Sequence, residues 1–281
     1  MLRLHVFNTG WVTLREERLY LGGERTPHTL PVLCFVAEHP RGLVVFDAGL
    51  HAAFGTAPRR YVGPLTDLAL PFRSRPGMTL SAQMELHGLC SESVTHVVLS
   101  HLHFDHTGDL RAFSRAQRYV ARQEWQAAQS RLSRLRGYLR KEYAGLPFTL
   151  LDLSLRNGLT LEQVSRDGYG VDLMGDGSLI VVPTFGHTPG HQSLLVFLSY
   201  GAVLLAGDAV YARAGYARPA AQPCARSPDV AWRTLMAVRA LAKGDPNALI
   251  LPAHDDSALR DLRRPDVLVH DATTSRATSS G

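Results

Sequence analysis

The chain has 281 residues, a formal net charge of +5, 45% hydrophobic residues and 20% charged residues. This balance is typical of a folded globular protein and excludes a largely disordered chain. No apolar run approaches the roughly 18 residues of a membrane helix, and the first residues are too polar for a secretion signal. The three cysteines, Cys34, Cys90 and Cys224, are too scattered for a secreted disulfide framework. We therefore expect a cytoplasmic protein.

The positive charge is concentrated between Arg111 and Lys141, where arginines recur near helical spacing with few aromatic residues among them. Because no stacking platform for bases is visible, this pattern favours a solvated helical face over a nucleic-acid site. Neither a nucleic acid nor a membrane is expected as a partner. Residues 272–281 have almost nothing to bury, so a disordered tail is expected after a single domain of residues 1–271.

Apolar runs along the chain predict eight strands, at Leu2–Phe7, Leu30–Val36, Leu43–Phe46, His96–Leu99, Leu179–Val182, Ser193–Phe197, Ala202–Leu205 and Ala248–Leu251. Helices are expected at Leu80–Leu89, Arg122–Lys141 and Asp229–Leu241. Residues 51–78, punctuated by proline and glycine, are expected to form a functional loop. Since strands and helices mix in both halves, we expect an α/β sandwich of two largely antiparallel sheets with helices outside.

A run of metal-binding residue types, SHLHFDHTG, follows the strand expected at His96–Leu99. Residues two apart in an extended segment point the same way, so His101 and His103 can grip one metal ion. A turn after Phe104 would let Asp105 and His106 face a second ion nearby. Imidazole with carboxylate suits zinc, iron, manganese or cobalt. The spacing therefore predicts a metal site.

Four ligands cannot complete two catalytic metal sites, so other segments must contribute. His187, Asp208 and His254 each follow a hydrophobic run, and this shared position favours all three together as further metal ligands. Asp208 beside Gly207 is well placed for a bridging ligand. The sum is five histidines and two carboxylates, which is enough for two divalent ions with open water positions.

These residues resemble the metallo-β-lactamase superfamily, whose His-x-His-x-Asp-His signature matches His101 to His106. The resemblance extends from Phe46 to His254 and implies that family's αββα sandwich. It implies one ion held by His101, His103 and His187, a second held by Asp105, His106 and His254, and Asp208 between them. It also implies that Asp47 orients a ligand histidine. For His191 an orienting role and plain packing stay open, and Asp255 and Asp256 are expected to be solvated.

Within the superfamily, the segments around His101, around His187 and from Asp208 to Tyr211 are most similar to the N-acyl homoserine lactonases. That resemblance implies opening of a lactone ring by a hydroxide bridging two divalent ions, with zinc favoured. It further implies that Tyr211 acts at the substrate carbonyl and that Asp105 relays a proton to the leaving alkoxide. The expected partner is a small-molecule lactone, and a homodimer stays open.

Other functions stay open beside the lactonase. The same ligands suit a glyoxalase II-type thioesterase, or a hydrolase of another lactone, an aryl ester or an organophosphate. A metal-binding protein without turnover is a further alternative, although seven ligand-type residues argue against a decayed site. No residue pattern indicates the length of an acyl chain.

Overall fold

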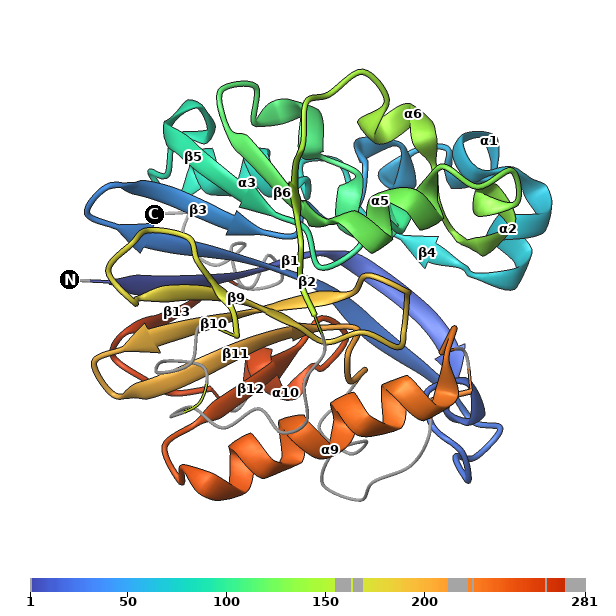
Figure 1. Cartoon of the computed structure of the whole chain (residues 1–281). Coiled ribbons are helices and arrows are strands. Elements are labelled where there is room, and N and C mark those ends of the chain that lie inside the picture. Colours follow the sequence, from blue (N-terminus) through green and yellow to red (C-terminus); the bar gives the residue numbers. More distant parts are fainter. Residues whose placement is uncertain are drawn as a thin grey trace, which may run out of the picture.

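Two β-sheets stack face to face in the computed structural model, with helices on the outer side of each (Figure 1). The structure describes residues 2–154, 163, 169–211, 222–223, 225–260 and 262–270. Each of the eight expected strands overlaps an observed one, so the α/β sandwich is confirmed. The expected tail at 272–281 lies outside the described residues.

The larger sheet has the strand order β13-β1-β2-β3-β5-β6-β7, with β4 paired to β1. Its strands are β1 (Arg3–Arg15), β2 (Pro27–His39), β3 (Gly42–Phe46), β4 (Phe72–Arg73), β5 (Val94–Val98), β6 (Gln117–Ala121), β7 (Thr149–Leu151) and β13 (Val267–His270). The pairs β1–β2 and β2–β3 are antiparallel, whereas β3–β5, β5–β6 and β6–β7 are parallel. This sheet is thus mixed rather than largely antiparallel, because helical crossovers join its later strands.

The smaller sheet has the order β12-β11-β10-β9-β8 and is antiparallel except between β11 and β12. Its strands are β8 (Val171–Asp172), β9 (Leu179–Pro183), β10 (Gln192–Leu198), β11 (Gly201–Gly207) and β12 (Leu249–Pro252). The described α-helices are α1 (Pro58–Val62), α2 (Pro64–Ala69), α3 (Leu80–Leu86), α4 (Phe104–Thr107), α5 (Arg122–Ala128), α6 (Arg140–Tyr143), α9 (Pro228–Gly244) and α10 (Ser257–Arg260).

Alternating side chains of the strands fill three apolar layers. Val44 and Phe46 of β3 face the smaller sheet, while Val45 of the same strand faces the outer helices. This alternation follows from the two-residue period of a strand, and burial of both faces explains the unbroken apolar run. On the far side, α9 packs Leu235 and Val238 against the smaller sheet (Figure 1). Packing of the two sheets therefore fixes the positions at which their strands end.

The helix expected over Arg122–Lys141 is wrong. The chain instead forms α5, a 3-10 turn η5 (Ser133–Arg136) and α6. Gly137 separates the last two with a φ of 90°, a left-handed conformation that favours glycine. Its carbonyl accepts a hydrogen bond from the Phe104 N–H at 3.0 Å. The break therefore brings this segment against the histidine motif, an interaction that arginine periodicity cannot reveal.

The expected loop at residues 51–78 contains short elements, namely a 3-10 turn η2 (Ala52–Gly55), α1, α2 and β4. Prolines begin both helices, where the missing N–H costs no intrahelical hydrogen bond. Phe54 and Phe72 anchor the segment in an apolar cluster with Phe104 of α4. Within the described part of the chain, no helix has the length and apolar character needed to cross a bilayer.

Candidate metal centre

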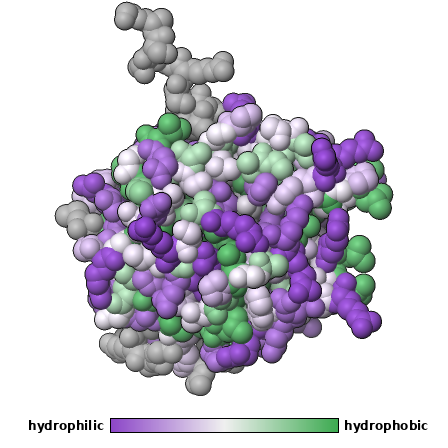
Figure 2. Space-filling view, turned by 90° about the horizontal axis from the view of Figure 1, so that it is seen from above, coloured by the Kyte–Doolittle hydropathy of each residue, from purple (hydrophilic) through white to green (hydrophobic). Residues whose placement is uncertain are grey.

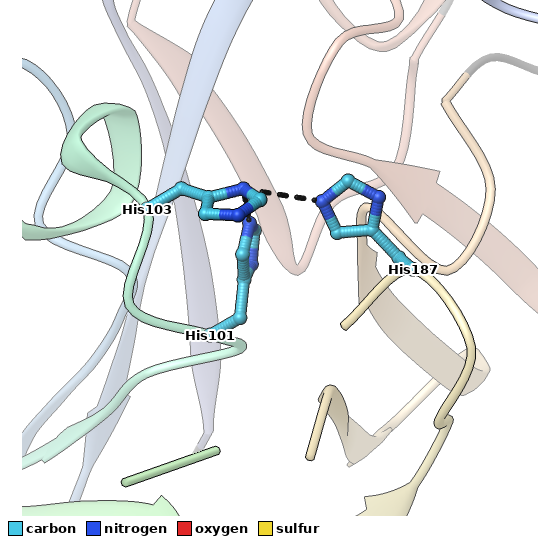
Figure 3. Close-up of side chains that lie close together, drawn as sticks. All are labelled: His101, His103 and His187. Carbon is cyan, nitrogen blue, oxygen red and sulfur yellow. Dashed lines mark hydrogen bonds between the residues drawn. The ribbon is translucent and has the colours of Figure 1, made fainter. Parts of the chain in front are cut away.

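Three histidines from two segments converge on one point (Figure 3). His101 and His103 follow β5, and His187 follows β9. His101 Nε2 lies 2.9 Å from His103 Nδ1, and His187 Nε2 lies 3.3 Å from the same atom. One ring nitrogen of each lies within 4.8 Å of the others, so the three imidazoles form a set that suits a single cation.

A second set of ligand-type groups adjoins the first. Asp105 and His106 belong to α4, and His254 follows β12. His106 Nε2 and His254 Nε2 both lie 3.4 Å from Asp105 Oδ2. The short helix α4 turns the chain immediately after His103, so consecutive residues of one motif face two different points. The structure thus assembles the two sets expected from the sequence.

Asp208, at the end of β11, lies between the two sets. Its Oδ1 is 3.4 Å from both His106 Nε2 and His254 Nε2, whereas its Oδ2 is 3.4 Å from His187 Nε2. His106 Nε2 and Asp208 Oδ1 are buried without a hydrogen-bond partner. Orphaned buried polar atoms are costly unless a cation satisfies them. The donor set therefore fits two ions that share Asp208.

Hydrogen bonds to the Nδ1 atoms of three of these histidines fix the orientation of their rings. His106 Nδ1 lies 2.8 Å from Asp47 Oδ2, and His254 Nδ1 lies 2.8 Å from the Pro31 carbonyl. His187 Nδ1 lies 2.8 Å from the Tyr211 hydroxyl. Since a carboxylate and a carbonyl only accept, His106 and His254 carry their proton on Nδ1 and leave Nε2 as the ligand atom. The expected orienting role of Asp47 is thus met at His106.

His191 supports Asp208 and does not belong to either set of ligand-type groups. Its Nε2 accepts the Asp208 backbone N–H at 3.0 Å, and its Nδ1 lies 2.8 Å from the Thr184 hydroxyl. A Cβ on Gly207, whose φ is 53°, would come within 2.9 Å of His191 Nε2. Glycine therefore allows the close approach that this contact needs. The orienting alternative for His191 is the one the geometry favours.

Sequence reasoning missed Glu124, a buried carboxylate of α5. Its Oε1 accepts the Leu102 N–H at 3.0 Å, and its Oε2 accepts the Gly190 N–H at 3.3 Å. Leu102 lies between two histidines of the first set, and Gly190 lies in the loop that carries His187. One side chain thus ties together the two loops of that set. No local pattern could have found it, because its partners are distant in sequence.

The electrostatics of the two sets differ. Burial and neighbouring histidines lower the pKa of His101, and burial lowers that of His103 to about 3, so both rings are neutral, as ligands must be. Burial alone would also lower the pKa of His106, but Asp105, Asp47 and Asp208 raise it well above its usual range. The carboxylates thus favour a positive charge at the second set, and a divalent cation would supply that charge.

A cavity of about 480 Å³ opens above the centre. His103, Asp105, His187, Asp208 and His254 form its polar floor. Its walls are largely apolar and come from β1, the turn that follows it, the chain at β4 and the turn η5, as Val12, Leu14, Leu19, Leu70, Phe72 and Leu135. Tyr211 also lines it and is 9% exposed. No pattern in the sequence indicated that β1 would line this cavity.

The expectation for Asp255 is wrong. Asp255 is buried at 5% exposure, and its carboxylate accepts the Ser257 N–H at 2.9 Å where the chain turns into α10. Asp256 is solvated as expected and forms a surface ion pair with Arg260 at 3.0 Å. His254 and Asp255 are both buried, and the chain reaches the surface at Asp256.

The chain belongs to the metallo-beta-lactamase superfamily, whose family model matches residues 29–254. It is 31% identical over 269 residues to the N-acyl homoserine lactonase AttM of Azorhizobium caulinodans, covering 94% of this chain and 97% of that protein. It is also 28% identical over 188 residues to an N-acyl homoserine lactonase of Bacillus cereus, covering 66% and 67% of the two chains.

Solved structures share this fold. An N-acyl homoserine lactone hydrolase with N-hexanoyl-L-homoserine bound at its catalytic metal centre superposes with a TM-score of 0.77 at 20% identity. That match covers 93% of this chain and 96% of the other. AidC, a dizinc quorum-quenching lactonase, superposes with a TM-score of 0.64 at 14% identity, covering 90% and 87%.

Proposed function

We propose that this protein is a metal-dependent hydrolase that opens the lactone ring of N-acyl homoserine lactones. The observation that carries the proposal is the pair of ligand sets sharing Asp208 on the floor of an apolar cavity. The similarity to lactonases over nearly the full chain supports this substrate class. An apolar wall suits an acyl chain, and a polar floor suits the lactone ring.

Two divalent cations, with zinc as our choice, would be held by the seven residues His101, His103, Asp105, His106, His187, Asp208 and His254. When bound, they would lower the pKa of a water from 15.7 toward about 7 and polarise the lactone carbonyl. The unpartnered His106 Nε2 and Asp208 Oδ1 support this assignment.

Tyr211 is proposed as a donor to the carbonyl oxygen of the substrate. If His187 ligates through Nε2, its Nδ1 carries the proton and donates to the Tyr211 oxygen, 2.8 Å away. The phenol then keeps its own O–H as a donor toward the cavity that it lines. Such a donor stabilises negative charge as it develops on the carbonyl oxygen.

Asp105 is proposed to move the proton. Burial would raise the pKa of this carboxyl, but His106 and His254 hold it well below its usual range, so Asp105 rests as a carboxylate. It accepts the proton of the attacking water and delivers it to the ring oxygen as the acyl C–O bond breaks. The products are the hydroxyl and carboxylate of an N-acyl homoserine, with one net proton released at neutral pH.

The test is a substrate panel on protein of measured metal content. We expect two equivalents of metal per chain and one proton released, by base titration, per homoserine lactone opened. The panel includes glutathione thioesters, aryl esters and phosphotriesters under identical conditions. Fast thioester turnover with inert lactones would overturn the proposal in favour of a glyoxalase II-type enzyme. Full activity with one equivalent of metal or none would overturn the two-metal assignment.

A further inference from the structure

Two segments that carry none of the proposed metal-binding or catalytic residues lie beside the cavity. They are residues 59–68, which include most of α1 and α2, and residues 131–135, which include most of η5; together we call them the rim. Leu70, directly after α2, and Leu135 of η5 both line the cavity. The Arg134 guanidinium lies 3.9 Å from the position that a Cβ on Gly63 would take. The two segments are therefore neighbours at the cavity mouth.

The rim exposes four leucines. Leu65 is 82% exposed, Leu68 83%, Leu132 54% and Leu135 84%. Each pair is three residues apart, a spacing that places side chains on one face of a helical turn. Figure 2 shows hydrophobic side chains standing out among hydrophilic ones at the margin where α1 and α2 lie. Clustered exposed leucines beside an apolar cavity mark an interaction surface.

Arginines surround these leucines. Arg59, Arg60, Arg131 and Arg134 are all exposed, and within the described part of the chain none of them has an ion pair. The single acidic residue of the rim, Asp67, is paired with Arg73 at 2.6 Å. The rim thus combines apolar side chains with uncompensated positive charge.

We propose that the rim docks on an anionic lipid surface, with the cavity mouth facing the bilayer. Leucines that enter the headgroup region and arginines that meet anionic headgroups are the two features of peripheral membrane binding. A second copy of this chain fits less well, because a two-fold contact would oppose four arginines to four others. A nucleic acid would use the arginines but would leave the leucines exposed. This departs from the expectation that the chain has no membrane partner.

The substrate consequence rests on the proposed function. A lactone with a long acyl chain partitions into lipid because the transfer of each methylene from water into the bilayer is favourable. Docking of the rim brings the apolar wall of the cavity to the surface where such substrates collect. We therefore expect the preferred substrates to be long-chain lactones presented by membranes, whereas short-chain lactones reach the site from water.

The first experiment measures co-sedimentation of the metal-loaded full chain with lipid vesicles. Vesicles of phosphatidylcholine mixed with phosphatidylglycerol should bind the protein, and vesicles of phosphatidylcholine alone should bind it weakly. The double variant Leu65→Ser/Leu68→Ser should lose at least about tenfold in vesicle affinity, since two leucines no longer enter the lipid. Leu86→Ser on α3, where Leu86 is 80% exposed, is the matched control and should bind like wild type.

The second experiment tests the charge. Arg59→Gln and Arg60→Gln should each weaken binding about fivefold and reduce its salt dependence. Arg233→Gln on α9, an exposed arginine outside the rim, should leave binding unchanged. None of the substituted residues lines the cavity, so hydrolysis of a short-chain lactone without vesicles should stay at the wild-type rate.

Three outcomes would overturn docking on lipid. One is vesicle binding that the rim variants do not weaken. The second is a dimer in light scattering that the leucine variants convert to a monomer, which would assign the rim to a second copy. The third is tighter binding to duplex DNA than to anionic vesicles. Failure of lactone hydrolysis in wild type with intact vesicle binding would overturn the proposed function instead.

Discussion

Two clusters of histidines in the described part of the chain differ in what surrounds the rings. The candidate metal centre joins its imidazoles to Asp105, Asp208 and Asp47 in a largely buried setting on the floor of the cavity. A second cluster gathers His5, His87 and His270 around Phe7. There His5 Nδ1 lies 2.9 Å from His270 Nε2, and Glu38 Oε2 lies 3.4 Å from His5 Nε2.

This difference teaches that proximity of imidazoles alone does not make a metal site. Among the described residues, the groups whose ligand atoms lie within 4.8 Å all belong to the first cluster. Carboxylates supply the negative charge there, and hydrogen bonds to the far nitrogen aim the lone pairs inward. In the second cluster the His270 ring packs against the rings of His5 and His87, and His5 and His270 also share a hydrogen bond. Their lone pairs therefore do not converge on one point.

The largest expected effect comes from removing the shared carboxylate. Asp208→Asn replaces a charged bridge with a neutral amide that offers one acceptor to two sites. Metal affinity and lactone hydrolysis should fall together, each by more than about 100-fold, beyond the usual cost of altering a supporting residue. Metal analysis and kcat/KM measure the two effects, and Asp256→Asn, at an exposed ion pair, is the control. Normal metal content would show that Asp208 is not a ligand.

Tyr211→Phe separates chemistry from metal binding. Only one hydroxyl is lost, so the fold and both metals should be retained. The value of kcat/KM should fall by roughly 10- to 1,000-fold, the range of modest to good donors to an oxyanion. Steady-state kinetics on a homoserine lactone with parallel metal analysis test this expectation. A wild-type rate of hydrolysis would refute a role of Tyr211 at the carbonyl. Loss of metal would instead show that the Tyr211 hydroxyl serves to orient the His187 ring.

Glu124→Gln tests the tie between the two loops of the first ligand set. Glutamine offers one carbonyl acceptor, so the Leu102 and Gly190 N–H groups cannot both be satisfied. We expect about a tenfold loss of metal affinity, measured by chelator competition, with the fold retained in circular dichroism. Glu92→Gln, at an exposed ion pair, should have no effect. If the chelator concentration that removes half of the metal were unchanged, Glu124 would have no role in metal binding beyond ordinary packing.

The smallest effect on activity is expected in the second cluster. Burial, with His87 and His5 adding repulsion, lowers the pKa of His270 from 6.5 to about 4. Below pH 6.5 the unfolded chain gains a proton that the folded chain resists, so stability falls between pH 6.5 and pH 4.

His270→Phe should therefore flatten the loss of thermal stability between those two pH values while leaving metal content and hydrolysis unchanged. Thermal unfolding at a series of pH values measures the slope. His28→Gln, at an exposed histidine, is the control and should keep the wild-type slope. A loss of metal in the His270 variant would contradict the claim that the second cluster plays no part in metal binding.

Local patterns determined much of this protein. Strand positions followed from apolar runs because burial requires them, and the ligands that we propose from His101 to His106 were suggested by their spacing within one turn of chain. His187, Asp208 and His254 could be inferred because each ends a hydrophobic run, and the ends of neighbouring strands meet at one edge of a sheet.

Contacts between distant segments were decided only by the tertiary structure. The bonds from Asp47 to His106 and from Glu124 to Gly190 join residues 59 and 66 positions apart. Gly137 interrupts the arginine-rich segment because its carbonyl must meet α4, and the rim and the second histidine cluster exist only once separate elements pack together. Sequence spacing fixes geometry within a turn or a strand, whereas the stacking of sheets and helices fixes which distant groups meet.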